Sequence, residues 1–164
     1  MAKQWFWLLP FVLITGCGGG GGGGSSTPAA ALSPSPTSTT LTMNLTQTYT
    51  ATGMHVAAGT QLTFTASGTF QWAPSPCVNC TTTPSGDPWS TCSYRQPPAY
   101  PAPGLPCWSL IGKIGASGTP FEVGTSLDYT VPTGVSGELY VGVNDNDLSD
   151  NSGSWTVMIS QTPS

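Results

Sequence analysis

Apolar and polar residues alternate in several short segments of this 164-residue chain. In Gln61–Ala66, the side chains of Leu62, Phe64 and Ala66 share one face of an extended chain, and the threonines share the other. The same period of two groups the apolar residues of four more segments: Trp108, Leu110 and Ile114; Leu127, Tyr129 and Val131; Leu139, Val141 and Val143; Trp155, Val157 and Ile159. Glycine and proline separate the segments, and no window of useful length has helical spacing. The pattern predicts an all-β domain, an antiparallel β-sandwich.

The first 16 residues have the layout of a secretory signal. Lys3 precedes the apolar run Trp5–Ile14, which is too short to span a bilayer as a permanent helix. Leu13–Cys17, with the sequence Leu-Ile-Thr-Gly-Cys, resembles the lipobox of bacterial lipoproteins, where cleavage precedes a cysteine that is then diacylated. We therefore expect residues 1–16 to be a lipoprotein signal peptide and Cys17 to carry lipid. An ordinary signal peptide cut nearby is the alternative.

The segment 17–40 is typical of a flexible tether behind the lipidated cysteine. Seven consecutive glycines, Gly18–Gly24, are followed by Ser, Thr, Pro and Ala without apolar periodicity, so little surface can be buried to offset the entropy of ordering. By the lipoprotein resemblance, Gly18 in place of Asp argues against retention in the inner membrane. We expect an anchor in the outer membrane or on the surface of a bacterial cell. A random-coil tether of this length holds the following domain, residues 41–162, roughly 25 Å from the lipid.

Composition excludes some functions. After removal of the signal peptide, Arg95 and Lys113 are the only basic residues, against seven acidic ones. Nucleic-acid binding needs clustered Lys or Arg, so we predict no nucleic-acid partner. The sequence has no Gly-x-Ser-x-Gly or His-Glu-x-x-His motif. Its single histidine, His55, is the only candidate for the histidine base that a Ser-His-Asp triad requires. We predict a protein that is not an enzyme and interpret His55 as a surface or edge histidine.

A proline-rich loop, residues 73–106, interrupts the alternating segments. The loop contains nine prolines, Pro106 included, and four cysteines lie in or beside it: Cys77, Cys80, Cys92 and Cys107. An even number of cysteines in an exported domain indicates disulfides, because that compartment is oxidising. Of three possible pairings we expect Cys77–Cys80 and Cys92–Cys107. A zinc site built from the same cysteines is the alternative.

The acid loop, Asn144–Ser154, contains three of the seven acidic residues: Asp145, Asp147 and Asp150. Like charges this close repel one another, and a bound cation relieves the repulsion. Carboxylates, side-chain amides and backbone carbonyls are the oxygen donors that Ca²⁺ prefers. The spacing is not that of an EF-hand, because Asp150 and Thr156 stand where that loop has Gly and Glu. A solvated turn is the alternative.

Three motifs resemble the LecA-like galactose-binding lectins: Val56–Gly68, Leu110–Gly115, and Asn144–Asp145 together with Asp150–Val157. The resemblance implies a jelly-roll-like sandwich of the galactose-binding-domain type, with one Ca²⁺ that two sugar hydroxyls contact directly. It also implies a ligand set, in which Asp145, Asp150 and Asn151 supply side-chain oxygens, and Trp72 and a residue near Asp147 supply backbone carbonyls.

The chain departs from this family where the sugar is selected. The family uses a His and a Gln before its second cysteine, whereas the only histidine here, His55, lies elsewhere. Galactose preference therefore does not carry over. Candidate sugar contacts are instead Asp145, Asn146 and Asp150 at the metal, and Tyr94, Arg95, Gln96 and Tyr100 in the proline-rich loop. The aromatic candidates for stacking on a sugar are Trp72, Trp89, Tyr94, Tyr100 and Trp108, although we interpret Trp108 as a core residue.

The sequence thus favours a surface-anchored, Ca²⁺-dependent, carbohydrate-binding lipoprotein. The alternative is a non-catalytic structural or protein-interaction lipoprotein in which calcium only stabilises the acid loop. The sequence names neither the glycan nor the oligomeric state.

Overall fold

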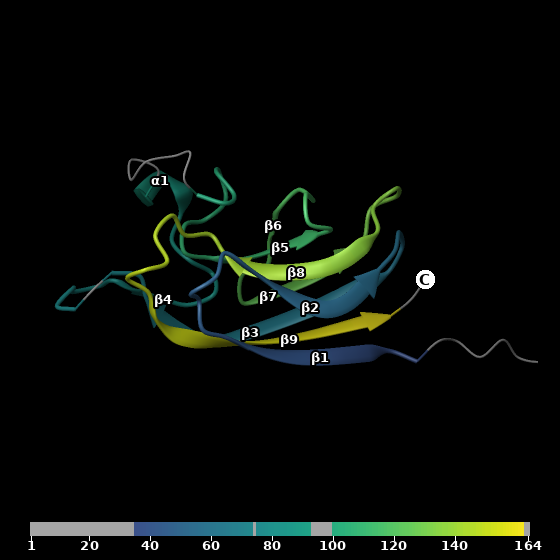
Figure 1. Ribbon diagram of the computed structural model, residues 1–164, viewed down its shortest axis with the longest axis horizontal. Coiled ribbons are helices and arrows are strands. Elements are labelled where there is room, and N and C mark those ends of the chain that lie inside the picture. Colours follow the sequence, from purple (N-terminus) through teal and green to yellow (C-terminus); the bar gives the residue numbers. More distant parts are fainter. Residues whose placement is uncertain (1–34, 74, 93–99, 163–164) are drawn as a thin grey trace, which may run out of the picture. The chain divides into compact units, whose positions relative to one another are not determined.

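The computed structural model describes residues 35–73, 75–92 and 100–162. Within them, two antiparallel sheets lie face to face (Figure 1). The first sheet has the order β1-β9-β3-β4, with β7 also paired to β3, and consists of β1 (Thr37–Met43), β3 (Gln61–Gln71), β4 (Thr81–Thr82), β7 (Ser126–Thr130) and β9 (Ser152–Thr162). The second has the order β2-β8-β5-β6 and consists of β2 (Tyr49–Val56), β5 (Leu110–Ile114), β6 (Phe121–Glu122) and β8 (Gly137–Val143). The predicted all-β antiparallel sandwich is confirmed.

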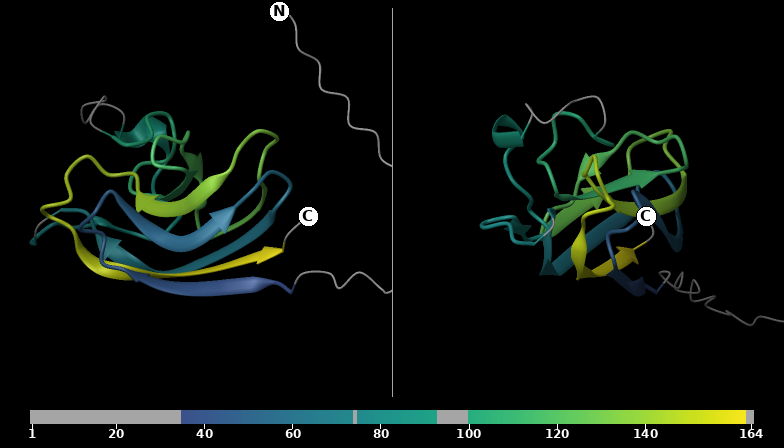
Figure 2. Two further views of the ribbon diagram at one scale, coloured as in Figure 1. Left: turned by 45° about the vertical axis from the view of Figure 1, so that its right-hand side comes forward. Right: turned by 60° about the vertical axis from the view of Figure 1, so that its left-hand side comes forward.

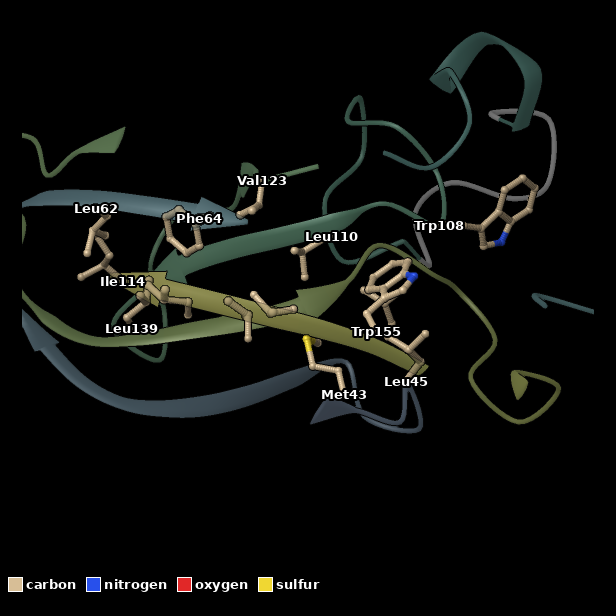
Figure 3. Packing of buried hydrophobic residues seen from close by; sticks show 14 of the residues in the cluster. Met43, Leu45, Leu62, Phe64, Trp108, Leu110, Ile114, Val123, Leu139 and Trp155 are labelled. Carbon is tan, nitrogen blue, oxygen red and sulfur yellow. The ribbon is translucent and has the colours of Figure 1, made fainter. Parts of the chain in front are cut away.

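The hydrophobic core lies between the two sheets (Figure 3). In β3, Leu62 and Phe64 are buried while the threonines between them are exposed, and β9 repeats the pattern with Trp155, Val157 and Ile159. Fully burying side chains of this size contributes about 1.5–3 kcal/mol each. The alternation in the sequence therefore identified the face of each of these strands that packs into the core.

The sequence pattern does not predict β1, β2, β4 or β6. β1 contains residues 37–40, which the sequence analysis assigned to the tether, so the domain begins at least four residues before Leu41. β1 is an edge strand whose backbone pairs with β9 from Thr37 to Met43, and β-branched threonine suits such a half-exposed position although it hides the alternation. In β2, a register shift between Ala51 and His55, around Gly53 with φ 74°, breaks the period of two.

The proline-rich loop is fastened by two disulfides, Cys77–Cys80 and Cys92–Cys107, with Cα separations of 5.7 and 6.3 Å. This is the expected pairing, and it leaves none of these cysteines for the alternative zinc site. Among the described residues of the loop, regular structure, which the sequence did not predict, is limited to β4 and one helical turn, α1 (Trp89–Cys92). A backbone bridge between Asp87 and Cys107 closes the loop at its end.

None of the helices in the described part of the chain is long and apolar enough to cross a membrane.

The acid loop and the start of β1 lie at opposite ends of the sandwich (Figure 2). β1 runs from Thr37, which faces Gln161 late in β9, to Met43, which faces Trp155 early in β9. Residues 144–151 connect β8 to the start of β9, so the acid loop lies at the Met43 end. The chain therefore enters the domain at the end opposite the acid loop, about 20 Å away at roughly 3.3 Å per strand residue.

Candidate functional site

The residues predicted to bind a metal lie where four strands begin or end. The acid loop joins β8 of the second sheet to β9 of the first. Trp72 directly follows β3, and Trp108 lies two residues before β5 begins. Antiparallel pairing places the end of β3 beside the start of β9, and the start of β5 beside the end of β8. Segments far apart in the sequence thus meet at one end of the sandwich.

Asn144 fastens the acid loop to the proline-rich loop. Its side chain is fully buried, and its Oδ1 accepts a hydrogen bond from the N–H of Ala102 at 2.9 Å. Its Nδ2 donates to the carbonyls of Ala102, Leu105 and Pro106 at 3.1, 3.2 and 2.9 Å. Its backbone carbonyl accepts from the N–H of Trp108 at 2.7 Å. The sequence analysis missed this role, because Asn is also an ordinary turn residue and nothing in the local pattern separates the two uses.

Asp145 is the buried acid of the loop, with 4% of its surface exposed. Burial raises the pKa of its carboxyl from 3.8 to about 6, although the neighbouring Asn151 side chain and the N–H of Asp147 act in the opposite direction. Oδ1 accepts from the N–H of Asp147 at 3.3 Å, whereas the buried Oδ2 accepts no hydrogen bond within the described residues. An ionised carboxylate in this position is costly unless a cation or donor compensates it.

Asp150 and Asn151 present two more buried oxygens of the same kind. Neither Asp150 Oδ1 nor Asn151 Oδ1 accepts a hydrogen bond within the described part of the chain. Burial, and then the charge of Asp147, raise the pKa of Asp150. The amide nitrogen of Asn151 is held in place, because Nδ2 donates a hydrogen bond to the carbonyl of Leu45 at 3.1 Å. Each of the three side chains assigned to calcium by the resemblance therefore has one buried oxygen that accepts no hydrogen bond within the described residues.

The carboxylate of Asp147 is used differently. It is exposed, and its Oδ1 accepts from the N–H and the hydroxyl of Ser149 at 3.0 and 2.6 Å, which lowers its pKa. This Asp–Ser turn commits the side chain to the loop itself. Among the described residues, no three His, Cys, Asp or Glu side chains are placed to hold one metal ion. A cation here would need two carboxylates together with amide and backbone oxygens, a donor set that suits calcium.

A cavity of about 300 Å³ opens beside these oxygens and is lined by Trp72, Ala73, Trp108, Asp145, Asn146, Asp147 and Asp150. The rings of Trp72 and Trp108 stack with centroids 3.9 Å apart and planes 6° apart. Trp108 is buried, as interpreted from the sequence, and Trp72 is half-buried. The cavity thus combines acidic and amide oxygens with an aromatic wall, a combination that can contact both the polar and the apolar faces of a ligand.

Other candidate residues do not reach this cavity or are not described. Tyr100 is buried and packs edge-to-face on Trp89, with centroids 5.5 Å apart, so neither residue lines the cavity. His55 is exposed on the edge strand β2, as interpreted from the sequence. The remaining candidates lie outside the described residues: Cys17, Tyr94, Arg95 and Gln96.

Comparison with known proteins adds one finding. No family model matches the sequence, and no curated protein matches it. Among solved structures, the chain is similar to the EclA N-terminal domain, described as a PllA-like lectin, with a TM-score of 0.54 and 23% sequence identity over 74% of this chain and 94% of that one. At this identity the likeness concerns the fold, and the described domain has a lectin-like fold.

Proposed function

We propose that this chain is a calcium-dependent carbohydrate-binding protein of the LecA-like kind. One observation carries the proposal: Asp145, Asp150 and Asn151 each hold a buried oxygen without a donor, beside the cavity with the tryptophan wall. Two carboxylates and an amide are hard oxygen donors of the type that calcium takes. The backbone carbonyls of Trp72 and of a residue near Asp147 would complete the protein's share of the ligands.

Calcium and the residues that line the cavity would each make a different kind of contact with a sugar. Calcium, when bound, would supply a positive charge with coordination positions left for two sugar hydroxyls, as the family resemblance implies. Asn146 is exposed at the cavity, where its amide can exchange hydrogen bonds with a further hydroxyl. The half-buried ring of Trp72 would contact the apolar face of the pyranose. The lectin-like fold supports this assignment.

Binding without catalysis is the consistent interpretation of the acids. Glycoside hydrolysis needs one carboxylic acid that gives up a proton and a second carboxylate that acts as base or nucleophile. If Asp145 and Asp150 bind a cation, the cation holds both in the ionised form, so neither serves as a general acid. Asp147 is occupied by its hydrogen bonds with Ser149.

We also propose that lipid on Cys17 anchors the protein in the bacterial envelope, at the outer membrane or cell surface. The lipobox resemblance at Leu13–Cys17 and the glycine-rich segment that follows it support this role.

A glycan array, run with calcium and with EDTA, tests the proposal. We expect glycan binding by the unmodified protein in calcium only, and none by Asp145→Ala. Asp128→Ala is the matched control, because Asp128 is an exposed acid on β7 that bonds Thr63 at 2.8 Å and does not line the cavity. Calcium should also raise the melting temperature of the unmodified protein and of the control. At a hundredfold excess of calcium over Kd, the free energy of unfolding should rise by about 2.7 kcal/mol.

Two outcomes would contradict the proposal in different ways. If calcium stabilises the protein through Asp145 and no glycan binds, the chain is the structural or interaction lipoprotein in which the ion only orders the acid loop. If calorimetry detects no calcium binding, both interpretations of the loop are wrong.

A further inference from the structure

A second and larger cavity lies at the other end of the sandwich. It measures about 570 Å³ and is lined by residues of the β5–β6 and β7–β8 connections. β8 separates the two cavities, because Ser136 of the second cavity precedes β8 and the acid loop follows it. The seven residues of β8 span about 20 Å. The acid loop and its proposed metal therefore take no part in this cavity, whose volume is typical of small-molecule sites.

The floor of this cavity is a fixed aromatic pair. The rings of Phe121 and Tyr129 stack with centroids 4.2 Å apart and planes 9° apart, and both side chains are half-buried. Phe121 also packs edge-to-face on the fully buried Phe64, at 6.2 Å between centroids. The ring lies directly over Gly112, where an added Cβ would come within 2.7 Å of it. The pair is thus held by the core and presents its outer surface to the cavity.

The rim consists of two tight turns, each closed by a backbone hydrogen bond. In the first, the N–H of Gly118 donates to the carbonyl of Gly115 at 3.1 Å, and the N–H of Gly115 donates to Glu138 at 2.8 Å. In the second, the N–H of Val135 donates to Pro132 at 3.1 Å. Rims fixed in this way reduce the ordering entropy that a ligand must offset on binding.

The lining selects for a neutral ligand with both apolar and hydroxyl surfaces. It contains no acidic or basic side chain among the described residues that form it, so a charged ligand would lose hydration without gaining a counter-charge. Three exposed hydroxyls surround the aromatic floor: Ser117, Thr119 and Ser136. An aliphatic ligand would gain no hydrogen bond from these groups, whereas a sugar ring can use both surfaces, with C–H groups on the rings and hydroxyls at the rim.

We propose that this cavity is a second, calcium-independent binding site for a neutral sugar ring. The proposal rests on the Phe121–Tyr129 floor and the uncharged rim, and it does not depend on the acid loop. A chain with both sites would bind two sugar units at opposite ends of one domain.

The test uses methyl glycosides of neutral hexoses in EDTA, with the Asp145→Ala variant as background, so that calcium-dependent binding is removed. Saturation-transfer NMR should detect glycoside binding, and the ring protons of Tyr129 and Phe121 should shift. Ser136→Trp places an indole in the cavity from an exposed position and should weaken binding at least tenfold. Thr133→Trp is the matched control, because Thr133 is exposed in the same connection and does not line the cavity.

Three results would overturn the proposal: no glycoside signal in EDTA, equal binding by the Ser136→Trp and Thr133→Trp variants, or a change of oligomeric mass in Ser136→Trp without glycoside binding. The last result would identify the cavity as a contact between copies of the chain. Failure here leaves the acid-loop proposal intact, because that proposal is judged by calcium-dependent binding to the glycan array.

Discussion

Asn144 offers the sharpest test of how the candidate site is held together. Its amide makes four contacts within 3.2 Å, but the NH₂ group has two hydrogens for three carbonyls, so about three full hydrogen bonds are at stake. At about 0.5–1.5 kcal/mol each, with the N–H of Ala102 left buried and unpaired, Asn144→Ala should lower the free energy of unfolding by about 3 kcal/mol. For a domain of about 130 residues, that corresponds to a fall in melting temperature of roughly 11 °C.

Asn144→Asp should be worse than Asn144→Ala, although it preserves the shape of the side chain. The carboxylate can still accept from Ala102, but its second oxygen would face three carbonyl oxygens in a buried site. Urea unfolding and differential scanning calorimetry in EDTA measure both variants. Asn146→Ala is the control, because Asn146 is exposed in the same loop, and it should change stability by less than about 0.5 kcal/mol. A loss below about 1 kcal/mol for Asn144→Ala, or an Asp variant as stable as the Ala variant, would refute the reasoning.

Three further predictions follow from the same region and from the N-terminus. In EDTA the folded-state pKa of Asp145, about 6, exceeds its unfolded value, so the contribution of Asp145 to stability should be fully present below about pH 4 and should be lost, by about 3 kcal/mol, as the pH rises from about 4 to 6; Asp145→Asn should remove this part of the pH profile measured by urea unfolding. Replacing both Cys92 and Cys107 with Ser should lower stability by about 2–4 kcal/mol in chemical denaturation, and a thiol assay of the unmodified exported protein should find no free thiol. Cys17→Ala should abolish incorporation of a labelled fatty-acid analogue and release the protein into the soluble fraction, whereas membrane association without label would contradict lipidation.

The sequence predicted the core more completely than the edges. Strands with one buried face, such as β3 and β9, alternate clearly because each second side chain must leave water. β1 escaped prediction because an edge strand of threonines buries little, and its stability comes from backbone pairing with β9 that no local pattern records. β2 escaped because the irregularity at Gly53 shifts the alternation midway along the strand.

In the candidate site too, the residues with a local sequence signal could be predicted, whereas those brought together by strand pairing could not. Asp145, Asp147 and Asp150 could be singled out because acids are rare in this chain and cluster in one loop, and the family resemblance implied Asp145, Asp150 and Asn151 as the side-chain ligands. The stacking of Trp72 on Trp108 could not, because the two residues come together only through the pairing of β3 with β9 and β5 with β8. The cavity at the other end has no local signal in the sequence, since Phe121 lies in β6, which the pattern does not predict, and Tyr129 alternates like any other strand residue.

Trp108 shows why the cavity wall beside the acid loop is set by the fold. Its φ of 57° lies in the left-handed region, which costs a non-glycine residue of order 1–3 kcal/mol and persists only where surrounding contacts impose it. Three such contacts are present: the N–H of Trp108 bonds to Asn144, its ring stacks on Trp72, and the preceding Cys107 is tied to Cys92. The wall is therefore in place before any ligand arrives, and the strain at Trp108 is offset by folding rather than by binding. The backbone carbonyl of Asn144, in the acid loop, accepts the hydrogen bond from Trp108 and so joins the acid loop to this wall. A ligand that contacts the loop or the wall therefore meets one preformed unit.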